Sequence, residues 1–259
     1  MSGTDTAGPG TNPLSGVEAY VFDVFGTVVD WYGSVTRALE AFAPESLKSE
    51  DWGSFAKEWR KGYGEYTKRV AHGGKGSSNA DVMHREILDG MLETARWKHL
   101  APVWGDAQRE ELVQFWHRLD GEKAPGRWPD SSAGLYAMKK KAIIGTLSNG
   151  NVRLLVDMAK HADLPWDVVF AGELLGSYKP NPKTYLGAVH HLGVTPERCA
   201  MVAAHIYDLR AAASHGLKTV YVRRPTEDAD VRDSIKSKAE GGEVDLVVGS
   251  FEELAALMP

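Results

Sequence analysis

From about residue 131 onward, short apolar segments rich in β-branched residues alternate with amphipathic helical segments. This alternation constrains the fold more than any other feature, because strands joined by helical crossovers pair in parallel. The predicted strands are 142–147, 168–170, 200–204, 219–222 and 246–248, and the predicted helices are 133–140, 152–161, 182–192, 208–215 and 251–257. We therefore expect an α/β core with a doubly wound, Rossmann-like parallel sheet.

One further strand, 17–22, stands far upstream of the others and ends at Asp23. The intervening sequence has helical periodicity, most clearly in the apolar residues Trp52, Phe55, Ala56, Trp59, Tyr63 and Tyr66. The sequence thus predicts a core formed by 17–33 and 128–259, with an all-helical cap subdomain, 34–127, inserted after the first strand.

Composition narrows the class of protein. Apolar residues make up 43% of the chain, the net charge is −5 without a basic cluster, and the single cysteine, Cys199, permits no internal disulfide. No apolar run approaches the roughly 18 residues that a membrane span needs. We expect a cytoplasmic protein that binds no nucleic acid and no membrane, with residues 1–16, rich in Gly, Thr, Pro and Ser, as a disordered lead-in.

Polar groups that follow the strands are the candidate functional residues, because ligands bind beyond the carboxyl ends of the strands in such sheets. Taken alone, Asp23 is as compatible with a turn or a helix cap as with a catalytic role. Three further polar strings follow later strands, namely LSNG at 147–150, YKPNP at 178–182 and AAHIYD at 203–208.

With these four motifs in this order, the chain from about residue 17 to its end resembles the haloacid dehalogenase superfamily. Most members are magnesium-dependent phosphatases with a second aspartate two residues after the nucleophile, where this chain has Phe25. Ala203 and Ala204 stand where those enzymes place an acidic metal ligand. The first motif instead resembles the type II, L-2-haloacid dehalogenase branch, which works without a metal, so we expect no metal and no cofactor.

The resemblance implies roles for individual residues. It makes Asp23 the covalent nucleophile, Thr27 the hydroxyl that orients it, and Lys179 the cation that keeps it ionised. Arg60, at the edge of the apolar stripe of its predicted helix, matches the cap arginine that receives the departing halide. A solvated surface arginine is the alternative.

In the second motif, the resemblance makes Ser148 and Asn149 the pair of residues that lies beside the substrate carboxylate and the departing halide. Four further residues are expected to contact the substrate: Val24, Phe25, Tyr185 and Tyr207.

The fourth motif departs from the dehalogenase pattern. That pattern has a serine and an asparagine where this chain has Ala203 and His205, although the downstream acid is retained as Asp208. His205 and Asp208 together are one replacement for the lost groups in the water-handling step. Alternatively, His205 marks a subgroup with another substrate, or caps the following helix.

The expected activity is metal-independent hydrolysis of a short 2-haloalkanoic acid to the 2-hydroxy acid through an aspartyl ester. The expected partners are the 2-haloacid and the halide ion, with a homodimer possible. Three alternatives stay open: a hydrolase of the same branch that acts on a non-halogenated small acid, a related phosphatase, and a binding protein without activity.

Overall fold

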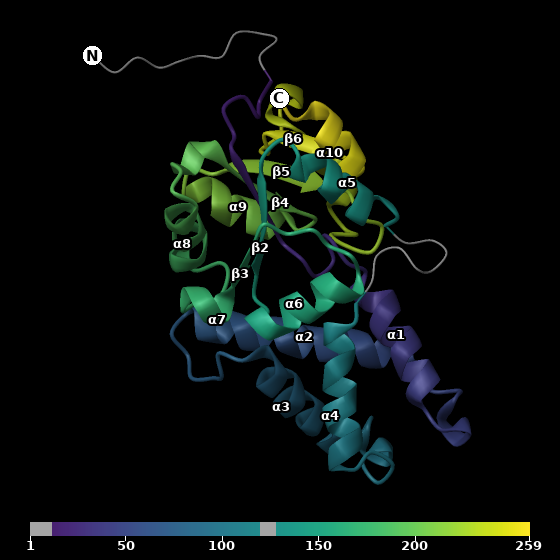
Figure 1. The fold of residues 1–259 in the computed structure, drawn as a ribbon. Coiled ribbons are helices and arrows are strands. Elements are labelled where there is room, and N and C mark those ends of the chain that lie inside the picture. The colour runs from purple at the N-terminus through teal and green to yellow at the C-terminus, as the bar shows by residue number, and fades with distance from the viewer. Residues whose placement is uncertain (1–11, 120–127) are drawn as a thin grey trace.

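The computed structural model describes residues 12–119 and 128–259, which form a parallel sheet covered by helices, with further helices along one end of the sheet (Figure 1). The six strands are β1 (Ala19–Phe22), β2 (Ile143–Ser148), β3 (Val168–Ala171), β4 (Cys199–Ala203), β5 (Lys218–Val222) and β6 (Leu246–Val248). They lie in the order β3-β2-β1-β4-β5-β6, and each pair is parallel. The predicted α/β Rossmann-like fold is confirmed.

The central strand β1 is buried along its whole length, as expected for a continuous apolar run between two parallel neighbours. Phe22 pairs with Thr146 of β2 on one side and with Val202 of β4 on the other. The carboxyl ends of these three strands are thus in register. The polar groups that follow them must therefore meet at one edge of the sheet.

Helices cover both faces of the sheet. The helices from residue 130 onward are α5 (Asp130–Lys139), α6 (Val152–His161), α7 (Gly172–Leu175), α8 (Pro182–Leu192), α9 (Ile206–Ser214) and α10 (Phe251–Leu257). Successive residues of β1 belong to different apolar clusters. Phe22 belongs to the cluster that includes α5, α6 and α10, whereas Val21 belongs to the cluster that includes α8 and α9. The period of two along the strand thus distributes the core between the two faces.

Four helices lie between β1 and α5 in the chain: α1 (Trp31–Phe42), α2 (Trp52–Ala71), α3 (Ala80–Glu93) and α4 (Asp106–Gln114). In Figure 1, α2 runs across the end of the sheet, with α3 and α4 beyond it. Side chains tie these helices to the core. The Tyr63 hydroxyl donates to the Asn149 carbonyl at 2.7 Å, and the Asn181 amide donates to the Ala71 carbonyl at 3.0 Å.

One expectation about the connections needs correction. Residues 12–16 form a turn in which Leu14 is completely buried and Asn12 donates to the Leu257 carbonyl at 2.7 Å. The expected disorder is therefore wrong for 12–16, and the rest of the lead-in, 1–11, lies outside the described residues. The polar connection 225–243 contains the short 3-10 helices Arg232–Ser234 and Lys238–Glu240.

The remaining short 3-10 helices are Glu45–Leu47, Lys98–Leu100, Phe115–His117 and Pro196–Arg198. Among residues 12–119 and 128–259, no helix has the length and hydropathy that crossing a bilayer requires.

Candidate active site

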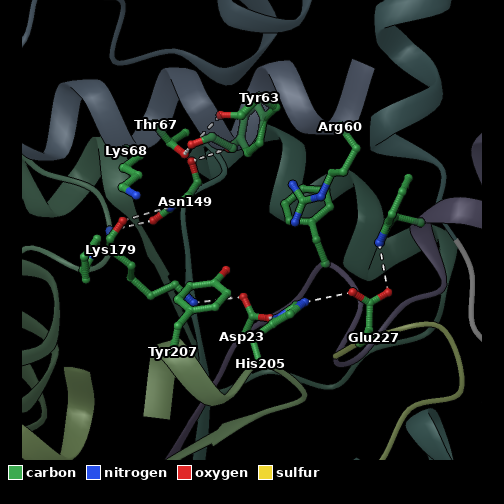
Figure 2. Close-up of a pocket in the computed structure, with 14 residues that line it drawn as sticks. Asp23, Arg60, Tyr63, Thr67, Lys68, Asn149, Lys179, His205, Tyr207 and Glu227 are labelled. Atoms are coloured by element: carbon green, nitrogen blue, oxygen red, sulfur yellow. Dashed lines mark hydrogen bonds and ion pairs between the residues drawn. The ribbon is translucent and has the colours of Figure 1, made fainter. Parts of the chain in front are cut away.

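A pocket of about 530 Å³ lies between the carboxyl edge of the sheet and α2. Figure 2 shows it from the side, with α2 above and the sheet loops below. Its walls are formed by Asp23, Phe25, Trp31, Arg60, Tyr63, Gly64, Thr67, Lys68, Asn149, Lys179, Pro180, His205, Tyr207 and Glu227. The pocket thus gathers residues that are up to about two hundred positions apart in the chain and includes all four motifs.

The Asp23 carboxylate, only 7% exposed, lies on the floor of the pocket and accepts three hydrogen bonds. Its Oδ1 accepts from the Lys179 ammonium at 2.9 Å. Its Oδ2 accepts from the Thr27 hydroxyl at 2.8 Å and faces His205 Nδ1 at 2.9 Å. Burial acts to raise the pKa of Asp23, but Lys179 and His205 outweigh it and hold the pKa well below its usual range. Asp23 is therefore an ionised carboxylate in a largely apolar pocket.

Lys179 is held between two carboxylates, because its ammonium also donates to Asp208. Burial opposes the charged ammonium, but Asp208 and Asp23 together raise the pKa of Lys179 above its ordinary value. The other oxygen of Asp208 accepts from the Tyr185 hydroxyl at 2.6 Å. Tyr185 is fully buried and lies outside the pocket lining. The structure thus places it behind Asp208 rather than at the predicted substrate contact.

The other predicted residues divide between the pocket and its support. Thr27 accepts from the Ala204 amide at 2.9 Å and so links the first and fourth motifs. Asn149 lines the pocket, but its Oδ1 accepts from the Lys179 amide at 2.8 Å, which joins the second and third motifs. Ser148 and Val24 are buried and lie outside the lining, so neither is placed at the predicted substrate contact. The Ser148 hydroxyl instead accepts from the Gly150 amide at 3.2 Å.

His205 lies at the bottom of the pocket, and its partners differ from the predicted ones. Its Nε2 lies 2.8 Å from Glu227 Oε2, whereas Asp208 is engaged by Lys179 and Tyr185. His205 occupies the residue before α9, yet its side chain makes no capping hydrogen bond, so the helix-cap alternative is wrong. Burial lowers the pKa of His205, but Tyr207, Asp23 and Glu227 raise it well above its ordinary value.

Glu227 is the functional candidate that sequence reasoning missed. It follows β5, within the connection 225–243, and is buried. Its Oε1 accepts from the Trp31 indole at 3.1 Å, across 196 positions of the chain. The available signal was its position just beyond the carboxyl end of a strand, the same edge that carries the four motifs.

Arg60 reaches the pocket from α2, as predicted (Figure 2). Its guanidinium carbon lies 5.0 Å from the Phe25 ring centroid, 5.3 Å from that of Tyr63 and 5.7 Å from that of Trp31. Among the described residues it forms no hydrogen bond and no ion pair, so its donors are available to an anion in the pocket. Tyr207, 59% exposed, lines the pocket near Asp23.

A magnesium ion does not fit this set of side chains. The carboxylates of Asp23, Asp208 and Glu227 are each already paired with Lys179 or His205. Ala203 and Ala204 are buried and supply no side-chain oxygen. Across the described ranges, no group of three or more His, Cys, Asp or Glu side chains is arranged to hold a metal ion.

Comparison with known proteins agrees with the fold and the motifs. The sequence profile of the haloacid dehalogenase-like hydrolases matches residues 17–216. The chain is 27% identical over 217 residues to (S)-2-haloacid dehalogenase 4A of Burkholderia cepacia, covering 82% of this chain and 85% of that protein. Two crystal structures are also similar. The defluorinating L-2-haloacid dehalogenase Rha0230 has a TM-score of 0.81 and 35% identity, with 93% of this chain and 95% of that chain covered.

The L-2-haloacid dehalogenase PA0810 has a TM-score of 0.78 and 33% identity, with 93% of this chain and 97% of that chain covered. The profile match spans more than half of the chain, and both structures exceed 30% identity over nearly all of it. The resemblance predicted from the four motifs is thus confirmed, and this protein belongs to the haloacid dehalogenase-like hydrolases.

Proposed function

We propose that the protein is a metal-independent dehalogenase that hydrolyses a short 2-haloalkanoic acid to the 2-hydroxy acid through an ester on Asp23. One observation carries the proposal: an ionised Asp23 on the floor of the pocket shares that pocket with an Arg60 guanidinium that forms no ion pair among the described residues. The names of three similar proteins, all 2-haloacid dehalogenases, support the same substrate class.

In this mechanism Asp23 displaces the halide from the α-carbon and inverts that carbon. Lys179 keeps the carboxylate ionised until it reacts, and Arg60 compensates the charge of the departing halide. The aromatic rings of Phe25, Tyr63 and Trp31 around Arg60 exclude water, which strengthens its attraction for an anion. Water then attacks the side-chain carbonyl carbon of Asp23 and releases the hydroxy acid.

A phosphatase reaction is disfavoured at two positions. Phosphate-ester hydrolysis needs an acid that protonates the leaving alcohol, and the Phe25 ring has no proton to give. The oxygens of Asp23 face Lys179 and His205, not an open metal position. The chemistry available to the pocket is therefore attack by a carboxylate with compensation of a small leaving anion.

The proposal is tested by halide release from each enantiomer of 2-chloropropionate after exhaustive chelation. We expect release to continue without metal, and Asp23→Asn to lower it by at least about 10⁴-fold, because an amide oxygen is a poor nucleophile. Asp233→Asn, at a side chain 84% exposed on the surface, is the matched control and should retain wild-type activity.

Phosphate release from a generic phosphoester that stops with chelator and returns with magnesium would contradict the proposal in favour of a phosphatase. Absence of both activities would contradict the 2-haloacid assignment and favour a non-halogenated substrate or a binding role.

A further inference from the structure

We propose that protonated His205 is a catalytic hydrogen-bond donor to Asp23 Oδ2 during ester hydrolysis, and that Glu227 is the positioning residue that keeps His205 protonated and oriented. The inference rests on the proposed function, because it needs an ester on Asp23. It replaces the sequence-based hypothesis, in which His205 and Asp208 together take a proton from water.

The two oxygens of Asp23 have different surroundings. Among the described residues, Oδ1 accepts one hydrogen bond, from Lys179, whereas Oδ2 is contacted by both Thr27 and His205. Each donor stabilises the lone pairs of the oxygen that it contacts, so Oδ1 is the better nucleophile. When Oδ1 forms the ester, Oδ2 becomes the carbonyl oxygen. Two donors then already face the oxygen that gains negative charge when water attacks.

The hydrogen bonds of His205 fix its charge state. Both ring nitrogens face carboxylate oxygens, Nδ1 at 2.9 Å from Asp23 and Nε2 at 2.8 Å from Glu227. An ionised carboxylate can only accept, so both ring nitrogens must carry a proton. An imidazolium has no free lone pair with which to take a proton from water. The geometry therefore assigns His205 as a donor and not as a base.

The charges around His205 agree with this assignment. The side chains that face it or its two carboxylate partners are Asp23, Glu227, Tyr207, Lys179, Thr27, Trp31, Thr226 and Arg60. Esterification removes the charge of Asp23, and Glu227 is then the carboxylate that still contacts His205. Glu227 is thus needed most in the second half of the reaction, when Oδ2 must be stabilised.

Contacts with residues at and just after the first motif fix the position of the Glu227 side chain. Trp31 donates to Glu227 Oε1 at 3.1 Å, and Thr226 donates to the same oxygen at 3.0 Å. Gly26 has a φ of +90°, and a Cβ at that position would lie 2.6 Å from Glu227 Cδ. A side chain at position 26 would therefore be strained by the left-handed backbone and would displace the Glu227 carboxylate. The turn after β1 leaves space for Glu227 beside the nucleophile.

The hydrolysis step balances without a change in the protonation of His205. Water adds to the ester carbon of Asp23, and the carbonyl electron pair moves onto Oδ2, which Thr27 and His205 stabilise. The bond from that carbon to Oδ1 then breaks, and Oδ1 leaves as the hydroxyl oxygen of the 2-hydroxy acid. One proton of the water ends on this hydroxyl and the other passes to solvent. Asp23 is restored with one oxygen from water.

The test follows the decay of the Asp23 ester by rapid quench and intact-protein mass, with 2-chloropropionate as substrate, across pH. A donor must be protonated, so we expect the decay rate to fall as pH rises through the pKa of His205. Glu227→Gln removes the carboxylate, and the fall should then begin at lower pH. At neutral pH we expect ester decay about 10- to 100-fold slower in Glu227→Gln, with a smaller effect on the burst of halide.

A second measurement does not depend on turnover. The ¹⁵N resonances of the His205 ring should show both nitrogens protonated at neutral pH in the resting enzyme, and Glu227→Gln should lower the pKa of the ring. His99 and Glu50 are the control, because they form a similar histidine–glutamate contact at 3.0 Å outside the pocket. Glu50→Gln should leave ester decay unchanged.

The outcomes separate this inference from the proposed function. No halide burst in the wild-type protein would contradict the proposed function and, with it, this role in ester hydrolysis. A normal burst with ester decay that rises with pH through the neutral range would make His205 a base and overturn the inference alone. A neutral His205 ring in the resting enzyme, or unchanged decay in both Glu227→Gln and His205→Gln, would also overturn it.

Discussion

Five charged side chains alternate in sign along one line of contacts: Glu227, His205, Asp23, Lys179 and Asp208. Each cation lies between two carboxylates, and the central carboxylate lies between the two cations. This alternation explains how a buried Asp23 stays ionised, since a cation lies on each side of it. Removal of His205 leaves Glu227 without its cation in this line, and removal of Lys179 does the same to Asp208, so conservative substitutions are the informative ones.

Substitution of Arg60 tests whether this residue recognises the leaving anion. Arg60→Lys keeps the positive charge but loses the planar set of donors. The loss of charge-assisted hydrogen bonds, about 1.5–3 kcal/mol, corresponds to a reduction in halide release of about 10- to 100-fold. The measurement is steady-state halide release, with circular dichroism as the check on folding.

The control is Arg96→Lys, because Arg96 also lies over an aromatic ring, that of Trp97, but is 53% exposed and outside the pocket. Wild-type release by Arg60→Lys would show that Arg60 does not bind the halide and would return it to the alternative of a solvated surface arginine.

At the scale of elements, His117 links α3 to α6. His117 is buried between Asp81 of α3 at 2.9 Å and Asp157 of α6 at 3.0 Å. Asn151, at the start of α6, donates to the same Asp81 carboxylate at 3.3 Å. Since α6 begins directly after the second motif, these bonds connect the inserted helices to a loop of the active site.

The stability of this contact should depend on pH. Burial opposes the charged form of His117, but hydrogen bonds to Asp81 and Asp157 raise its pKa above the ordinary value. Because the pKa of His117 is higher in the folded protein than in the unfolded chain, protonation of His117 stabilises the fold. This stabilisation is complete below the unfolded-state pKa of about 6.5 and is lost as pH rises through the folded-state pKa. We expect the thermal midpoint to fall by a few degrees between about pH 6 and pH 9, equivalent to about 1 kcal/mol.

His117→Gln should remove this pH-dependent difference, and the two proteins should have similar midpoints near pH 9. Identical pH profiles for the wild type and His117→Gln would contradict a charged His117 between these helices. Both proteins keep Arg153, which pairs with Asp157 at 2.8 Å.

At the scale of the whole molecule, the features predicted from sequence are those with a local signal. The apolar run of β1 predicted a central buried strand, and the end of that strand predicted the position of Asp23. Lys179 could be placed because its motif follows a strand and resembles that of a known family. Arg60 could be placed because the helical period of α2 fixed its direction.

The missed features depend on the closed tertiary structure. His205 and Glu227 are 22 positions apart on different strand ends, and nothing local in the sequence pairs them. Tyr185 was placed against the substrate because it follows Lys179, but packing of α8 directs its hydroxyl to Asp208. Leu14 was assigned to a disordered lead-in by composition, although its burial and the Asn12 hydrogen bond hold that turn on the core.

The central claim is that Asp23 forms a covalent ester with the substrate, and single turnover in H₂¹⁸O with enzyme in excess over 2-chloropropionate tests it most directly. The product oxygen should come from Asp23, so the first hydroxy acid should be unlabelled and one ¹⁸O atom should appear in the peptide that contains Asp23. Label in the first product, with none in that peptide, would show direct attack by water and contradict the account.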